Sequence, residues 1–282
     1  MLKTQALTAA LLAAVACAAA TGTAYAAPVL PTRSPGHAPA AESVPVRGPD
    51  LTLLNRAIRQ HRGASHGKPA ANARSTNWAG YGVTGGTFTS VSANWVEPSV
   101  TCTSNGIVGF WIGLDGWGSN TVEQDGTGVD CQSGKPQQFA WWETYPANSI
   151  QVYSAPVAAG DRMSSSITYQ GDGRYLMVLT DQTARWTAQN PVSLPAARNV
   201  SAEIVAEAVT AGDDITSLPD FGSVAFTDAT INGGTLQSVG AQALDMTDQS
   251  DNLIATTTTA DPSGDFAVNF AASTTTSASV TG

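Results

Sequence analysis

The feature that most constrains the fold is a succession of short runs rich in Val, Thr, Phe and Trp, separated by glycine-containing turns. Such runs are typical of β-strands, and turns such as Gly171-Asp172-Gly173 and Asn232-Gly233-Gly234 predict antiparallel hairpins. The expected strands are Thr87–Val96, Gly106–Leu114, Gln138–Tyr145, Met163–Tyr169, Tyr175–Leu179, Val224–Ile231, Thr235–Val239, Leu253–Thr259 and Phe266–Phe270. The stretch Trp111–Gly126 is expected to form a strand, an Asp-Gly turn and a second short strand that ends in glycine. A body of roughly 200 residues built in this way predicts an all-β fold, a two-sheet antiparallel β-sandwich, in a single domain.

One segment is ambiguous from its sequence alone. Ser201–Val209 is rich in alanine, and its glutamates, Glu203 and Glu207, are four residues apart, as on one face of a helix. We expect a strand, because the neighbouring segments have strand patterns. In either conformation the two glutamates share a face. In a strand, the opposite face would pack into the core and would consist of Ala202, Ile204, Ala206 and Ala208.

Two segments of different composition precede the predicted domain. Residues 1–26 have the form of a secretory signal peptide, with Lys3, an apolar run too short to cross a bilayer, and Ala24-Tyr25-Ala26 before the cleavage point. We therefore expect a secreted, extracellular protein with no membrane partner. Residues 27–74 are expected to form a basic propeptide or linker, and residues 75–282 the β-sandwich domain.

The arm (residues 27–74) and the body (residues 75–282) carry opposite charge. The arm has seven basic residues against two acidic ones, a net charge of +5, whereas the body has five against twenty, a net charge of −15. This asymmetry indicates a detachable arm that binds the body as its own propeptide, although a simple secreted linker would have the same composition. An acidic body is not expected to bind nucleic acid. We expect a monomer.

Two cysteines remain after the signal peptide is removed, Cys102 and Cys131. In an oxidising compartment such a pair predicts a disulfide, which would brace the segment that contains Gln124. All three histidines lie in the arm, and Lys135 is the only lysine of the body. Ser-His, Cys-His and Ser-Lys catalytic systems are therefore not expected, and neither is a histidine zinc site. We expect no metal and no organic cofactor.

Six motifs occur in an order and at spacings that resemble one family. They are NWAGY (Asn77–Tyr81), WIGLDG (Trp111–Gly116), TVEQDG (Thr121–Gly126), WWETYP (Trp141–Pro146), AGDRM (Ala159–Met163) and AEIVAE (Ala202–Glu207). Together they resemble the glutamic peptidases, also called eqolisins, well over residues 77–209 and more loosely beyond them. The resemblance implies a concanavalin-like jelly roll and an endopeptidase that acts on proteins and peptides in acid.

The resemblance also assigns residues to roles. It implies a catalytic dyad of Gln124 and Glu207. The positions that it implies for substrate binding are Trp78, Trp111, Asp115, Trp141 and Glu143. The sequence departs from the family at Glu123 and Asp125, where Leu and Thr are usual.

An amide and a carboxylate are sufficient for this chemistry. A carboxylate such as Glu207 can take a proton from water and return it to the leaving nitrogen, and an amide such as Gln124 can donate a hydrogen bond to the oxyanion. Two alternatives stay open on the same sandwich: a glycoside hydrolase that uses Glu143 and Glu207 as paired acids, and a lectin-like carbohydrate-binding module. Gln124 distinguishes the peptidase from the glycoside hydrolase, because a glycoside hydrolase does not need the side-chain amide.

Overall fold

The structure is a computed structural model that describes residues 72–211 and 214–272. The strands, in chain order, are β1 (Ala73–Ser75), β2 (Trp78–Thr84), β3 (Ser90–Val96), β4 (Ile107–Asp115), β5 (Val122–Asp130), β6 (Gln137–Tyr145), β7 (Asn148–Val152), β8 (Arg162–Gly171), β9 (Arg174–Asp181), β10 (Trp186–Ser193), β11 (Ser201–Ala208), β12 (Thr210–Ala211), β13 (Asp214–Ile215), β14 (Ser223–Ile231), β15 (Gly234–Thr235), β16 (Gln242–Thr247), β17 (Leu253–Thr257) and β18 (Phe266–Phe270). Within the described ranges there is no helix, so none that could span a membrane. The predicted all-β class is confirmed.

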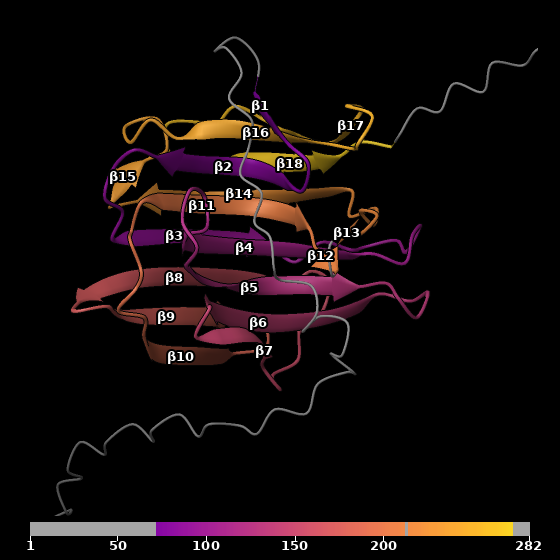
Figure 1. The fold of residues 1–282 in the computed structure, drawn as a ribbon. Helices are drawn as coiled ribbons and strands as arrows, with labels where there is room; N and C mark the ends of the chain where they lie inside the picture. Colours follow the sequence, from indigo (N-terminus) through magenta and orange to yellow (C-terminus); the bar gives the residue numbers. More distant parts are fainter. Residues whose placement is uncertain (1–71, 212–213, 273–282) are drawn as a thin grey trace, which may run out of the picture. The chain divides into compact units, whose positions relative to one another are not determined.

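A 16-stranded sheet follows the order β10-β9-β8-β3-β14-β18-β17-β16-β2-β11-β4-β5-β6-β7, with β1 beside β16 and β15 beside β14 (Figure 1). Neighbouring strands are antiparallel except β1 and β16, which are parallel. β4 also contacts β8, and β5 contacts β9, although these strands are far apart in the hydrogen-bonded order. The sheet therefore folds over on itself, and its two halves pack face to face as an open antiparallel sandwich, as predicted.

The main core lies between the two layers, because alternate side chains of each strand point inward. On β4 these are Val108, Phe110, Ile112 and Leu114. Side chains of the opposite layer that belong to the same core include Trp95, Met163, Ile167 and Phe226. Burying a side chain of this size contributes roughly 1.5–3 kcal/mol. The intervening residues of β4, such as Trp111, consequently face outward from the sandwich.

The ambiguous segment is strand β11, which pairs with β2 on one side and β4 on the other. Its alanines and Ile204 lie in the main core, which confirms the predicted face. The predicted strand Thr235–Val239 is wrong beyond Thr235. There the backbone forms local turns, in which Val239 N donates to Thr235 O at 3.2 Å and Ala241 N donates to Leu236 O at 2.9 Å. The sequence pattern also missed the strands β1, β2, β7, β10, β12, β13 and β16.

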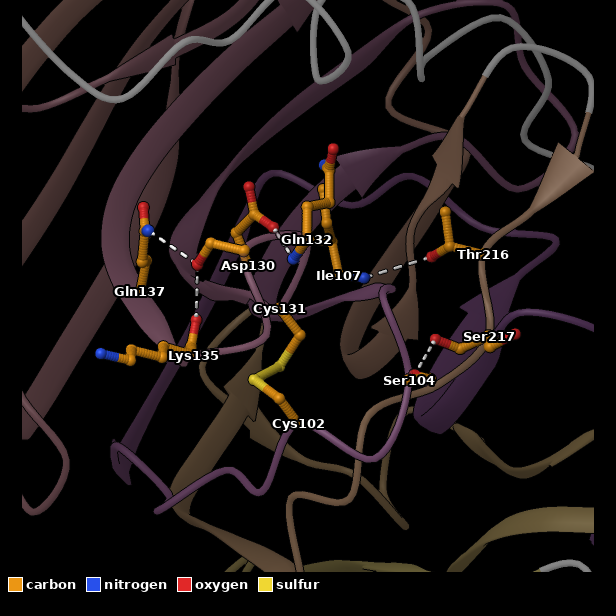
Figure 2. Close-up of a disulfide and its surroundings, with 11 residues drawn as sticks. Cys102, Ser104, Ile107, Asp130, Cys131, Gln132, Lys135, Gln137, Thr216 and Ser217 are labelled. Atoms are coloured by element: carbon orange, nitrogen blue, oxygen red, sulfur yellow. Dashed lines mark hydrogen bonds between the residues drawn. A yellow bond between two sulfur atoms is a disulfide. The ribbon is translucent and has the colours of Figure 1, made fainter.

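A disulfide joins Cys102, in the loop after β3, to Cys131, directly after β5 (Figure 2). The Cα atoms of the two cysteines are 5.3 Å apart. Cys131 N also donates to Gly106 O, at 3.0 Å, so the bridge lies where β4 begins and β5 ends. The covalent link therefore fixes one end of the β4–β5 pair, and Gln124 lies on β5.

The predicted signal peptide and all but the last three residues of the predicted arm lie outside the described residues. Those last three residues are part of the ordered body. Ala73–Ser75 is β1, whose register on β16 pairs Ala73 with Leu244 and Ser75 with Met246. The domain boundary expected between Arg74 and Ser75 thus falls inside a paired strand.

Candidate active site

Strands β2, β11, β4, β5 and β6 lie side by side (Figure 1). The alternation of side chains along these strands places most of the residues that the sequence singled out on their outer face. These are Trp78, Glu207, Trp111, Gln124, Trp141 and Glu143. The three tryptophans belong to an apolar cluster distinct from the main core. Trp78 and Trp111 meet edge to face, with ring centroids 5.4 Å apart. Among the six residues the most exposed is Glu207, at 8 %.

Glu207 is held through both of its carboxylate oxygens. Trp111 Nε1 donates to Oε2 at 2.8 Å, and Asn77 Nδ2 donates to Oε1 at 3.1 Å. Burial raises the pKa of Glu207 to about 7, while hydrogen bonds from Trp111, Trp78 and Asn77 lower it. The donors stabilise the ionised form, so Glu207 can serve as a base although it is buried.

Gln124 and Glu143 are direct cross-strand neighbours on β5 and β6. Gln124 Nε2 donates to Glu143 Oε2 at 2.6 Å. Burial raises the pKa of Glu143 to about 8 against the lowering effect of this hydrogen bond, and the negative charge of Glu207 raises it further. The carboxyls of Glu143 and Glu207 therefore interact electrostatically across the face. Burial and the charge of Glu207 both favour the neutral form of Glu143, which stays protonated in acid.

Glu203 is a second acid on this face of β11. The register places Glu203 opposite Gly113, which is itself opposite Gln124, whereas Glu207 lies four residues further along the strand. Glu203 is fully buried. Burial raises its pKa well above the ordinary value, and the charges of Asp115 and Glu123 add to the rise. Burial therefore favours the neutral form of Glu203.

Glycines on β4 and β5 make room for the indole that binds Glu207. A Cβ at Gly126 would lie 2.2 Å from Phe110 O and 2.7 Å from the Trp111 Cα. A Cβ at Gly113 would lie 2.9 Å from the Trp111 ring. Real Cβ contacts are longer than this, so any larger residue at either position would displace Trp111.

Asp115, the last residue of β4, is engaged by the loop that precedes β11. Its carboxylate accepts hydrogen bonds from the Thr121 hydroxyl and from the backbone N–H groups of Arg198, Asn199 and Val200, at 2.7–3.0 Å. These bonds fix the loop that leads into β11, and the substrate-binding role of Asp115 stays a prediction. Trp142 packs against the main core, as its place opposite Trp141 on an alternating strand implies.

The residues that the structure describes include no group of three or more His, Cys, Asp or Glu side chains arranged to hold a metal ion. The polar groups of the site are instead the amides of Gln124 and Asn77 and the carboxyls of Glu143, Glu203 and Glu207. The chemistry that they offer is proton transfer and hydrogen-bond donation.

Residues 76–270 match the Peptidase A4 family. The chain belongs to this family. It is 27 % identical over 199 residues to Aspergillopepsin-2 of Aspergillus niger, which covers 61 % of this chain and 70 % of that protein. The Peptidase A4 match makes the chain a hydrolase of peptide bonds and a glutamic peptidase, and it decides against the glycoside hydrolase and lectin alternatives.

Solved structures agree on the fold. Scytalido-glutamic peptidase, in complex with a transition state analog inhibitor, superposes with a TM-score of 0.61 at 21 % identity, covering 70 % of this chain and 98 % of that one. Aspergilloglutamic peptidase from Aspergillus niger superposes with a TM-score of 0.51 at 21 % identity, covering 58 % and 99 %. The Peptidase A4 chain described here therefore has the sandwich of the eqolisins.

Two features of this Peptidase A4 site were missed from the sequence. Asn77 lies in the NWAGY motif, yet only the structure shows that its side chain holds Glu207. The signal that could have found it is a polar residue directly before a buried strand. The role of Gly113 and Gly126 was also missed, because spacing along one strand gives no information about an indole that crosses the neighbouring strand.

Proposed function

We propose that the chain is a secreted, acid-acting endopeptidase that cleaves proteins and peptides with Gln124 and Glu207 as its dyad, without a metal or organic cofactor. The observation that carries the proposal is the buried carboxylate of Glu207, held by donors that favour its ionised form. SCP-B, an eqolisin that superposes with a TM-score of 0.59 at 20 % identity, was solved in a complex with the tripeptide Ala-Ile-His. That complex supports peptides as the substrate class.

In this mechanism Glu207 takes a proton from the attacking water and later delivers it to the leaving nitrogen. Gln124 supplies the oxyanion donor. Its NH₂ group has two hydrogens, and the bond to Glu143 uses one of them. The second hydrogen is available to the oxygen of the tetrahedral intermediate. Glu143, neutral in acid, holds the amide with its nitrogen on the required side.

Two opposing effects of pH define the working range. With its pKa raised to about 7, Glu207 is mostly protonated in acid, and its ionised fraction grows as pH rises. Activity therefore rises with pH at first. Buried carboxyls such as Glu97 and Glu123, whose pKa values burial raises to about 8 and about 9, ionise as pH rises further, and this destabilises the fold. The optimum lies on the acid side of neutrality.

The test uses the variants Glu207→Gln and Gln124→Ala, assayed on denatured casein between pH 3 and pH 7. Loss of general acid–base catalysis reduces the rate by about 10²–10⁴, and loss of one oxyanion donor by about 10²–10³. We expect losses of this size in both variants, with circular dichroism unchanged.

Glu203→Gln is the matched control, because Glu203 is a buried glutamate on the same face of the same strand. It should keep kcat/KM within a few-fold of the parent protein. Substantial casein hydrolysis by folded Glu207→Gln would contradict the dyad. If Glu203→Gln were inactive and Glu207→Gln active, Glu203 would be the base instead. Glu203 and Gln124 are both paired with Gly113 in the sheet register.

A further inference from the structure

The segment directly before β2 contacts the proposed base from outside its own strand. Asn77 is 3 % exposed, and its Nδ2 donates to Glu207 Oε1 at 3.1 Å. The backbone of the same residue is also bound to β11, because Asn77 O accepts from Ala208 N at 2.9 Å. Asn77 therefore binds the Glu207 side chain through its amide and the backbone of Ala208 through its carbonyl.

Ser75 in turn holds Asn77. The Ser75 Oγ donates to Asn77 Oδ1 at 3.3 Å, and it accepts from the backbone N–H groups of Asn77 and Trp78 at 3.4 Å and 3.1 Å. Because Oδ1 accepts from Ser75, the amide is oriented with Nδ2 toward Glu207. Ser75 is 4 % exposed, so water does not compete for these bonds.

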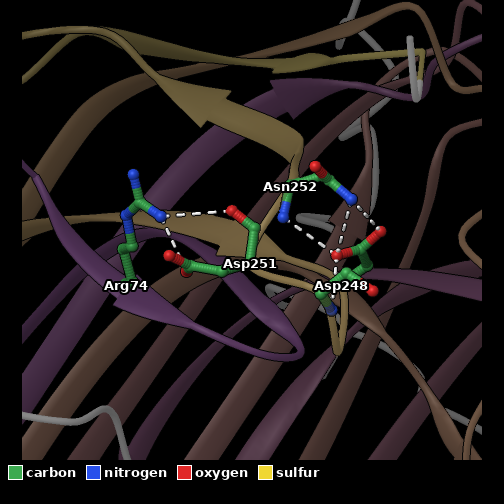
Figure 3. A network of polar contacts seen from close by, with 5 residues as sticks. Arg74, Asp248, Asp251 and Asn252 are labelled. Carbon is green, nitrogen blue, oxygen red and sulfur yellow. Dashed lines mark hydrogen bonds and ion pairs between the residues drawn. The ribbon is translucent and has the colours of Figure 1, made fainter. Parts of the chain in front are cut away.

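Residues 72–75 tie this arrangement to the far side of β2. β1 pairs with β16, and Asn72 Nδ2 donates to Asp245 Oδ1 at 2.9 Å and to Thr257 O at 2.8 Å. Arg74 lies against the β16–β17 turn, with Nη1 2.6 Å from Asp251 Oδ1 (Figure 3). The strap, which we define as residues 72–77, is therefore anchored at one end and ends on Glu207.

We propose that Asn77 is a positioning residue for the peptidase reaction, which orients the Glu207 carboxylate and is itself set by Ser75 and the strap. This inference rests on the proposed role of Glu207. Trp111 fixes Oε2 and Asn77 fixes Oε1, so together they prevent the carboxylate from turning about its last bond. Asn77 acts through Glu207 and makes no contact with the scissile bond in this scheme.

The charges around Glu207 determine how the proposal is tested. Glu143 of β6 interacts with Glu207 through its charge, and donors come from Trp111 of β4, Trp78 of β2 and Asn77. Asn77 is the donor that can be exchanged for an acid of the same shape. In Asn77→Asp, a protonated Asp can donate to Glu207 in acid, whereas an ionised Asp repels it.

The experiment measures kcat/KM on a casein-derived peptide from pH 3 to pH 9 for the full chain, so that the range includes the midpoint set by Glu207. In Asn77→Ala the midpoint of the rising limb should move up by about one pH unit, because a hydrogen bond to a charged group is lost. Activity well below that midpoint should fall about tenfold. Asn77→Asp should retain parental activity at the lowest pH and lose it progressively as pH rises. Ser75→Ala should shift the midpoint in the same direction as Asn77→Ala, by less.

Asn94→Ala is the control, because Asn94 Nδ2 also binds a carboxylate, Asp228 Oδ2 at 2.9 Å, on the surface. It should leave the midpoint unchanged. A purely structural Asn77 would lower the unfolding temperature and the active fraction equally at each pH, with the midpoint in place. An unshifted midpoint in Asn77→Ala, with Glu207→Gln inactive, overturns this inference alone. An active Glu207→Gln overturns the proposed function beneath it.

Discussion

Glu97 provides a quantitative test of how this fold depends on pH. It follows β3 and is 1 % exposed, between the layers of the sandwich. Thr127 Oγ1 donates to Glu97 Oε2 at 2.5 Å, and Trp95 Nε1 donates to the same hydroxyl at 3.0 Å. Burial raises the pKa of Glu97 from 4.5 to about 8, hydrogen bonds from Thr127 and Trp95 lower it, and the charges of Asp161 and Asp181 raise it. The ion pairs of the described residues, Arg74–Asp251 and Arg174–Asp172, lie on the surface.

The sign of the effect follows from the raised pKa of Glu97. Below pH 4.5 the group is protonated in both states, and its contribution to stability is complete. Between pH 4.5 and about 8 the unfolded chain releases the proton while the folded chain keeps it, so the free energy of unfolding falls. The loss is about 1.4 kcal/mol per pH unit, and at most about 5 kcal/mol over the whole window. Since domains have about 5–15 kcal/mol of stability, one such group is a large fraction of the total.

The perturbation is Glu97→Gln, which keeps the shape and an acceptor for Thr127 but does not titrate. Urea unfolding, followed by tryptophan fluorescence at one-unit steps from pH 4.5 to pH 7.5, measures the free energy of unfolding. A Glu207→Gln background prevents self-digestion. The parent should lose about 1.4 kcal/mol per unit more than Glu97→Gln. The exposed Asp172→Asn change should leave the parental slope intact. Equal slopes in the parent and Glu97→Gln would refute the assignment of a buried, neutral Glu97.

Two further predictions concern the disulfide and the arm. Replacing Cys102 and Cys131 by Ser should lower the free energy of unfolding by about 3–4 kcal/mol, since the bridge closes a loop with a sequence separation of 29. Chemical unfolding with and without reductant measures this loss, and an unchanged free energy of unfolding would contradict the prediction. A synthetic peptide of residues 27–74 should inhibit casein hydrolysis more at pH 6 than at pH 3.5, because the body's carboxylates lose charge in acid. Inhibition should also be weaker in high salt, which screens the attraction between the arm and the body. Absence of inhibition at both pH values would leave the arm a linker.

The fold class was predictable because it rests on local signals. Glycine turns and alternating apolar residues located strands such as β8 and β9, and their hairpin turn at Gly171–Gly173. β10 lacked such a signal. It is an edge strand without a fully buried side chain, and it contains Pro191. β16 is short, and the strands that it pairs with, β1 and β2, are far from it in the sequence.

The candidate site was predictable as a set of residues but not as a network. Motifs selected Gln124, Glu143 and Glu207, yet the pairing of Gln124 with Glu143 depends on the register of β5 against β6. The hydrogen bond from Asn77 to Glu207 joins residues that are 130 positions apart in the sequence. Register and long-range contacts are properties of the packed sheet, and a motif in one strand does not encode them.

Strand β5 shows why hydropathy misjudges a chain of this kind. Val122–Asp130 contains one glutamate, one glutamine and two aspartates, which at neutral pH are typical of a solvated turn. In the structure every residue before Asp130 is buried, and Glu123 and Asp125 occupy the inner face of the strand. Burial raises the pKa of Asp125 to about 7 and that of Glu123 to about 9. In acid both are neutral polar groups, and a neutral carboxyl is far less costly to bury than a charged one. Protonation therefore lowers the cost of placing these acidic residues on the inner face of a strand, a cost that hydropathy assigned at neutral pH overstates.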